Sequence, residues 1–152
     1  MRGAKGISFA PRDNLNKLRI PQKFAFPPAT EEQIEETERL LGFPLYPFLR
    51  ELYTQIANGG FGPGYGLNGI IGGFENGGLG PMIERYREDK PSASERKTDP
   101  AQFLELCHWG CAVYSYLENK TGRIYHMTDD EKYECDAPSL EAWLELRIIG
   151  GV

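Results

Sequence analysis

Hydrophobic positions in the first third of the chain recur with the period of a helix. The segment Thr30–Gln33 has the composition of a capping box, and it precedes a narrow apolar stripe that Gly42 ends. Pro47 suits the first position of a second helix, whose apolar residues continue at helical spacing to Ile56. This part of the chain therefore predicts two consecutive helices.

The rest of the chain predicts a small antiparallel meander and a closing helix. We expect a short strand over 67–74, a helix over 81–88, a polar loop over 89–99, strands over 103–108, 111–118 and 123–127, an acidic loop over 129–134, and a final helix from Pro138. This order predicts a single α+β domain over residues 29–152. Residues 1–28 lack periodicity and are rich in proline, so we expect an extended N-terminal arm there, with a short helix near 14–19.

Composition is that of an ordinary globular domain, with 40% hydrophobic and 26% charged residues among 152. No apolar run approaches the roughly 20 residues that span a bilayer, and the N-terminus lacks the apolar core of a signal peptide. Three cysteines are an odd number without a secretory context, which is typical of reduced thiols. We therefore expect a cytoplasmic protein.

Charge is distributed unevenly along the chain. Residues 1–28 carry six Lys or Arg and one Asp, a net of +5; because the whole chain carries −5, residues 29–152 carry −10. An acidic body repels nucleic acid and anionic membranes and attracts basic partners, although acidity also serves solubility alone.

Glycine is concentrated in one segment, since 11 of the 18 glycines lie between Gly59 and Gly80. Gly64, Gly66 and Gly69 match the dinucleotide fingerprint, but that fingerprint requires a strand before it and a helix after it. Here the predicted order is reversed, and no Lys or Arg lies between residues 50 and 85 to neutralise a phosphate. We interpret the segment as an exposed, flexible loop that shapes a surface.

The chain offers little for metal binding or catalysis. Cys107, Cys111, Cys135 and His126 suggest zinc, but a continuous strand would hold the first two too far apart, and only a break in that strand would leave zinc possible. Buried thiols are the alternative interpretation. Cys107 and His108 are adjacent on an expected strand and so point to opposite faces. We predict no catalytic residues, no cofactor and no bound metal.

Aromatic residues suggest an interface instead. Tyr114 and Tyr116 alternate along one expected strand, Tyr65 lies in the glycine-rich loop, and Glu75 supplies a carboxylate there. Tyrosines are common in protein interfaces, although aromatic residues that face a core are commoner still. We take these four residues as candidate partner-binding residues.

Three sequence patterns together resemble the SUKH superfamily, which includes a yeast regulator of cell-wall synthesis and many bacterial toxin-immunity proteins. They are Leu40-Leu41-Gly42-Phe43-Pro44-Leu45 with Leu49-Arg50-Glu51-Leu52-Tyr53 and the glycine segment, then Cys107-His108-Trp109-Gly110-Cys111-Ala112, and Leu140-Glu141-Ala142-Trp143-Leu144. The resemblance covers about residues 30–148. It implies a curved, mostly antiparallel sheet with flanking helices, and the family has no general catalytic residues to carry over.

The resemblance implies a non-catalytic protein that binds and neutralises a polymorphic toxin, often a nuclease. A basic toxin domain would fit the acidic body, whereas nucleic acid, membrane and small-molecule substrates are not expected. The alternative is a regulatory or scaffolding domain of the cell-wall-regulator type. A third hypothesis is a zinc-dependent enzyme built around the three cysteines.

Overall fold

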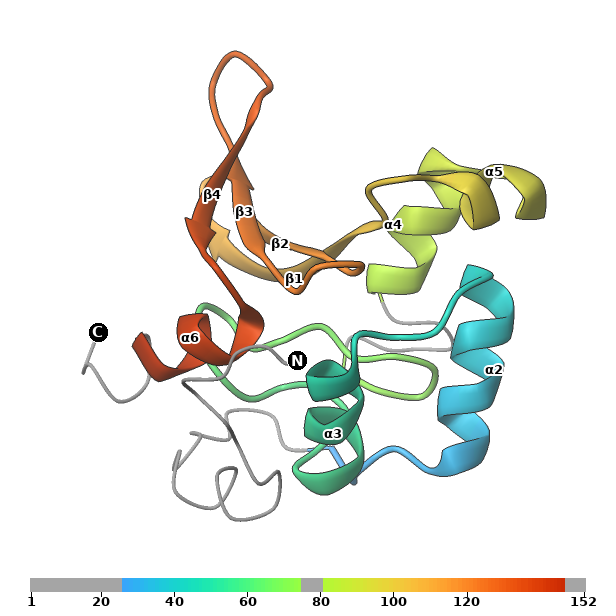
Figure 1. The fold of residues 1–152 in the computed structure, drawn as a ribbon. Helices are drawn as coiled ribbons and strands as arrows, with labels where there is room; N and C mark the ends of the chain where they lie inside the picture. The colour runs from blue at the N-terminus through green and yellow to red at the C-terminus, as the bar shows by residue number, and fades with distance from the viewer. Residues whose placement is uncertain (1–25, 75–80, 147–152) are drawn as a thin grey trace.

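The computed structural model describes residues 26–74 and 81–146 of the chain. Its elements, in order, are α2 (Glu31–Leu41), α3 (Pro47–Gln55), α4 (Pro81–Asp89), α5 (Ala93–Thr98), β1 (Phe103–Gly110), β2 (Val113–Glu118), β3 (Ile124–Met127), β4 (Tyr133–Ala137) and α6 (Leu140–Leu144). The strands form one antiparallel sheet in the order β1-β2-β3-β4 (Figure 1). The predicted single α+β domain with an antiparallel sheet is confirmed, and that sheet is uncurled.

The first two helices form as their sequences predict. Thr30 and Gln33 make the reciprocal capping box: the Gln33 amide donates to Thr30 Oγ1 at 3.1 Å, and the Thr30 amide donates to Gln33 Oε1 at 2.8 Å. Gly42 ends α2 with a φ of 95°, the left-handed conformation that glycine adopts without strain. Pro47 is the first residue of α3.

Three predicted elements are wrong. Residues 67–74 form turns instead of a strand, because their glycines bend the chain after one isolated bridge from Leu67 to Cys107. The polar segment 89–99 contains α5, whose first turn is capped by Ser92. The expected acidic loop extends only as far as Lys132, since Tyr133 and Glu134 already belong to β4.

The turn between β1 and β2 differs from the expected one by two residues. Cys111 and Ala112 form the loop, with φ angles of 53° and 62°, and Gly110 pairs with Val113 across it. Positive φ at both central positions is the geometry of a two-residue hairpin turn, which matches the twist of the strands. Without asparagine or glycine at these positions, the sequence carries no signal for this turn.

One face of the sheet builds the hydrophobic core. Leu104, Leu106, Leu117 and Ile124 are all fully buried on this face. Helices α3 and α6 lie below the sheet, α4 lies beside it, and α2 lies against α4 and α5 (Figure 1). The helices contribute further fully buried side chains such as Leu49, Leu52, Met82, Ile83 and Leu140. Aliphatic side chains in this number supply the main favourable free energy of folding.

The glycine-rich loop is largely buried, so the expectation of an exposed, flexible loop is wrong. Residues 57–62 and 66–70 are buried, and Asn58 holds the loop closed: its Oδ1 accepts from the Ile70 amide at 2.8 Å and its Nδ2 donates to the Ile71 carbonyl at 3.0 Å. A Cβ at Gly73 would lie 2.3 Å from Asn58 Oδ1. The loop therefore needs glycine for close packing.

The loop also runs beside β1. The Tyr65 amide donates to the His108 carbonyl at 3.0 Å, and the Asn68 amide donates to the Leu106 carbonyl at 2.7 Å. Tyr65, at the tip, remains 57% exposed. The loop thus covers the outer edge of β1 and presents one tyrosine.

The first described residues pack against the domain. The Asn58 amide donates to the Pro27 carbonyl at 3.1 Å, and Phe26 makes an edge-to-face contact with Phe74. We therefore place residues 26–28 with the folded domain and not with the arm. The expected helix near 14–19 lies outside the described residues.

Candidate functional site

Aromatic side chains cover the sheet face opposite the core. We call this surface the aromatic face; its rings belong to Tyr65, Phe103, His108, Tyr114, Tyr116, Tyr125 and Tyr133. Successive side chains of a strand point to opposite faces, so Tyr114 and Tyr116 lie here while Ser115 and Leu117 point toward the core. Tyr65 reaches the same face from the glycine-rich loop.

The rings form one continuous series of contacts. Tyr65 meets His108 edge to face at 5.5 Å between centroids, and His108 stacks on Tyr114 at 4.6 Å. Tyr116 lies 6.4 Å from Tyr114 and meets Tyr133 at 5.4 Å. Such pairs stabilise by roughly 0.5–1.5 kcal/mol each beyond simple burial, so the rings hold one another in a fixed arrangement.

Phe103 and Tyr125 complete the series at its far end. Phe103 stacks on Tyr133 with 4.2 Å between centroids and meets Tyr125 edge to face at 5.2 Å. Tyr133 is still 39% exposed. The far end of the aromatic face is therefore ordered but accessible.

A charged pair lies between α4 and the aromatic face. Arg85 approaches Glu105, with 3.7 Å between Arg85 Nη2 and Glu105 Oε1, and its guanidinium lies 5.8 Å from the centre of the Tyr114 ring. Glu105 is only 8% exposed, and its backbone carbonyl accepts a hydrogen bond from Asn68 Nδ2 at 3.1 Å. Burial raises the pKa of Glu105, and the charge of Arg85 and a hydrogen bond from Asn68 oppose that rise.

Beside this pair, α4 and the sheet enclose a hollow of about 550 Å³. Its wall combines the rings of Phe103, Tyr116 and Tyr133 with the carboxylates of Asp89, Asp99 and Glu105 and the cations Arg85 and Lys90. Burial raises the pKa of Tyr116 to about 12 and also raises the pKa of Tyr133. Tyrosine hydroxyls are protonated at neutral pH even without such a shift, and both can donate hydrogen bonds to a partner.

Three of the four predicted site residues come together on this surface. Tyr65, Tyr114 and Tyr116 belong to the aromatic face, whereas Glu75 lies outside the described residues. Sequence reasoning missed Arg85, Phe103 and Tyr133. The segment that contains Tyr133 is acidic and predicts a loop, and no local pattern links Arg85 to a strand that begins 18 positions later.

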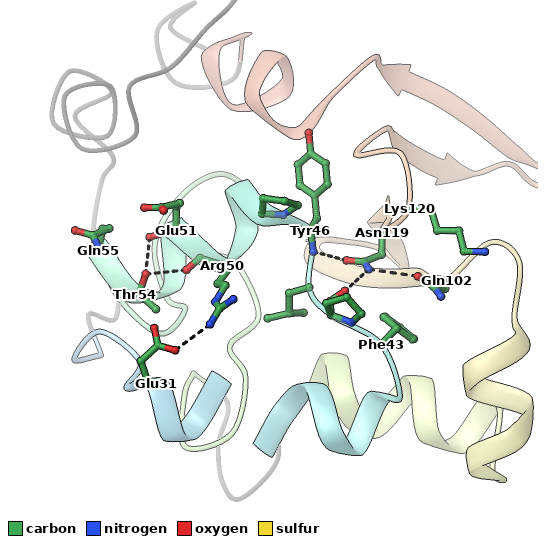
Figure 2. A pocket seen from close by; sticks show the side chains of 13 residues that line it. Glu31, Phe43, Tyr46, Arg50, Glu51, Thr54, Gln55, Gln102, Asn119 and Lys120 are labelled. Carbon is green, nitrogen blue, oxygen red and sulfur yellow. Dashed lines mark hydrogen bonds and ion pairs between the residues drawn. The ribbon is translucent and has the colours of Figure 1, made fainter. Parts of the chain in front are cut away.

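A larger hollow of about 880 Å³ lies around α3 and the α2–α3 connection (Figure 2). Its polar groups largely satisfy one another: Asn119 Oδ1 accepts from the Tyr46 amide at 2.8 Å, and Asn119 Nδ2 donates to the Pro44 carbonyl at 2.8 Å. Arg50 pairs with Glu31 at 2.9 Å. These bonds fix the α2–α3 connection against the turn after β2, so we interpret this hollow as a structural joint despite its size.

The cysteines do not converge on a metal site. Cys107 is buried, but Cys111 and Cys135 are exposed, which corrects the interpretation that all three thiols are buried. His126 Nδ1 lies 2.8 Å from Asp136 Oδ1. Within residues 26–74 and 81–146 no group of three or more His, Cys, Asp or Glu side chains has an arrangement that could hold a metal ion.

The fold and this surface are those of a small α+β domain with an aromatic sheet face. A family model, the SMI1 / KNR4 family (SUKH-1), matches residues 28–146, and the chain therefore belongs to that family. This confirms the resemblance noted in the sequence. A search of curated proteins found no match. Among the described helices, none has the length and apolar character required to traverse a bilayer.

Proposed function

We propose that this protein is a cytoplasmic binding module of the immunity type, which neutralises a basic toxin domain by covering its active cleft. Membership of the SUKH-1 family is consistent with such a module or with a regulatory domain, and the family is generally non-catalytic. The proposal is that the aromatic face is the surface that contacts the toxin.

The observation that carries the proposal is the continuous series of partly exposed rings on the aromatic face. Tyrosine, tryptophan and arginine dominate the binding energy of protein interfaces. Tyrosine and tryptophan bury a large area with only two side-chain torsions, and arginine adds a charged, planar group with five hydrogen-bond donors. Here Arg85 and several tyrosines are held in place by contacts with one another before any partner arrives. Preorganisation of this kind lowers the entropic cost of association.

The negative charge of the domain also supports a basic partner. Residues 29–152 carry a net −10, and Asp89, Asp99 and Glu105 line the hollow beside the rings. Many nuclease toxins are basic, and opposite net charges raise the rate at which two proteins meet.

Co-expression with toxin domains encoded beside the gene tests the proposal, with growth rescue as the measurement. We expect rescue by the natural chain, loss of rescue in the double variant Tyr114→Ala/Tyr116→Ala, and unchanged rescue in Arg50→Ala at the joint around α3. Thermal unfolding of each variant separates lost binding from lost folding. Absence of rescue and of a complex with every neighbouring gene product would overturn the proposal.

The alternative is a regulatory or scaffolding module in which the basic N-terminal arm contacts an acidic partner. The observation that favours it is the net +5 of residues 1–28 beside an acidic body. A chain that begins at residue 26 separates the two functions while keeping the Pro27 contact. Toxin neutralisation should survive this deletion, whereas docking through the arm should not.

A further inference from the structure

The two edges of the sheet differ in what lies beside them. Strand β1 has β2 on one side and the glycine-rich loop on the other, through the Tyr65 and Asn68 amides. Strand β4, at the opposite end of the sheet, has only β3 beside it in the part of the chain that the structure describes, and the β3–β4 hairpin projects from the domain (Figure 1). An edge strand with one neighbour offers its remaining backbone groups for pairing.

The hydrogen-bond pattern shows which backbone groups point outward. The Thr128 amide donates to the Lys132 carbonyl at 2.7 Å, so these residues form the last bonded pair of the hairpin. Bonded pairs alternate along an antiparallel ladder, and the next one is therefore His126 with Glu134. It follows that Tyr133 and Cys135 direct their N–H and C=O groups away from β3.

The uncharged side chains of β4 lie on one face of the sheet and its acidic side chains lie on the other. Tyr133 and Cys135 project to the aromatic face, where Tyr133 stacks on Phe103. Glu134 and Asp136 project to the opposite face, where His126 lies between them at 3.6 Å and 2.8 Å. The hairpin loop adds Asp129, Asp130 and Glu131 against Lys132, so the edge is acidic.

We propose that β4 binds an extended basic segment of a protein partner as a fifth strand. The N–H and C=O groups of Tyr133 and Cys135 supply the backbone pairing. Lys or Arg at alternate positions of the partner lies beside Glu134 and Asp136, and the intervening apolar residues extend the aromatic face beside Tyr133. Main-chain bonds give the affinity and the alternating side chains give the specificity.

A second copy of this chain fits the edge poorly. If Tyr133 of one copy pairs with Cys135 of the other, the two Glu134 carboxylates lie directly opposite each other. If Cys135 pairs with Cys135, Glu134 lies opposite Asp136 twice. If Tyr133 pairs with Tyr133, Glu134 lies opposite Lys132, but the turn over 129–131 ends the strand just beyond, so only one bonded pair forms. Like charges directly across a strand pair are destabilising, so the edge favours a basic strand from another protein. The proposal concerns this edge alone and does not require that the partner be a toxin.

Amide hydrogen exchange of the full chain tests the proposal directly. The probe is a synthetic peptide of alternating Lys and Val, and the control is a peptide of alternating Glu and Val. We expect the Lys peptide to slow exchange at the Tyr133 and Cys135 amides, with little change at Glu134, which is already bonded to β3. The Glu peptide should leave all three amides unchanged.

Charge reversal tests the specificity. The variant Glu134→Lys/Asp136→Lys should bind the Lys peptide at least roughly tenfold more weakly, because two cross-strand ion pairs become repulsive. The control Glu32→Lys/Glu35→Lys makes the same change in net charge on the distant helix α2. It should lose much less affinity for the Lys peptide. Equal loss in the two variants, protection elsewhere than β4, or a dimer of the natural chain in solution would overturn the proposal.

Discussion

The two faces of this sheet use the same four strands for opposite purposes. On the inner face, aliphatic side chains such as Leu104 and Leu117 are fully buried. On the outer face, the neighbouring positions carry Phe103 and Tyr116, which contact other rings and line a hollow open to solvent. Residues adjacent in sequence thus contribute to stability on one side and to a candidate interface on the other.

This difference shows how alternating residues of one strand can stabilise the fold on one face of the sheet and form a binding surface on the other. Aliphatic groups gain most of their free energy by leaving water, so they belong to the core. Tyrosines combine a large apolar ring with a hydroxyl that remains useful at a wet surface, so they can stay partly exposed. Adjacent substitutions on β2 should therefore have different consequences.

The largest effect should come from Leu117→Ala on the inner face. The substitution removes a fully buried side chain and leaves a cavity, and we expect it to lower the free energy of unfolding by about 2–5 kcal/mol. Urea denaturation followed by circular dichroism measures this loss. A loss below about 1 kcal/mol would mean that the inner face is not the main core.

Gly69→Ala should come next, because it tests whether the glycine-rich loop is packed. A Cβ at Gly69 would lie 2.6 Å from both the Asn58 carbonyl oxygen and the Phe74 nitrogen. Overpacking of this kind costs about 1–3 kcal/mol, measured by the same denaturation. Gly62→Ala is an informative comparison, since its Cβ would meet only Leu67 side-chain atoms at 3.4 Å or more, although its φ of 87° still adds strain.

Tyr116→Ala should sharpen the comparison between the faces. We expect a loss of about 2 kcal/mol in binding to the protein partner, as for a typical interface hot spot. Stability should fall by about 1–3 kcal/mol, through the two lost ring contacts with Tyr133 and Tyr114. Calorimetric titration with the partner, set against the unfolding curve, gives both values. A stability loss as large as that of Leu117→Ala would place Tyr116 in the core instead.

The smallest effect should come from Glu105→Gln, which should change how stability depends on pH. Because the pKa of Glu105 is raised in the folded state, the folded chain binds the proton more tightly than the unfolded chain does. Ionisation of Glu105 therefore costs stability as pH rises from the ordinary glutamate pKa through the raised value. Glu105→Gln should remove this dependence of stability on pH. The free energy of unfolding of the variant should therefore increase relative to that of the natural chain as pH rises.

Denaturation of both chains between pH 4 and pH 7, at matched ionic strength, measures the Glu105 effect. Parallel stability curves for the two chains would show that Arg85 and Asn68 together offset the burial of the carboxylate completely.

Much of the fold could be predicted from local pattern. The capping box at Thr30, the stop at Gly42 and the start at Pro47 follow from backbone chemistry within a few residues, and all three are confirmed. The alternation of Tyr114 and Tyr116 predicted their common face. Strand β4 was missed because an acidic edge strand exposed over most of its length lacks an apolar pattern.

What the sequence determined by itself is local: where helices α2 and α3 begin, which residues of β2 share a face, the acidity of the body and the family. Tertiary structure decided the rest. It determined that the glycine-rich loop packs around Asn58 and along β1 and that Arg85 lies over Tyr114. It also determined that, among the described strands, only β3 pairs with β4. These outcomes depend on contacts between residues far apart in the chain, whose free energies of burial and pairing exceed any local preference.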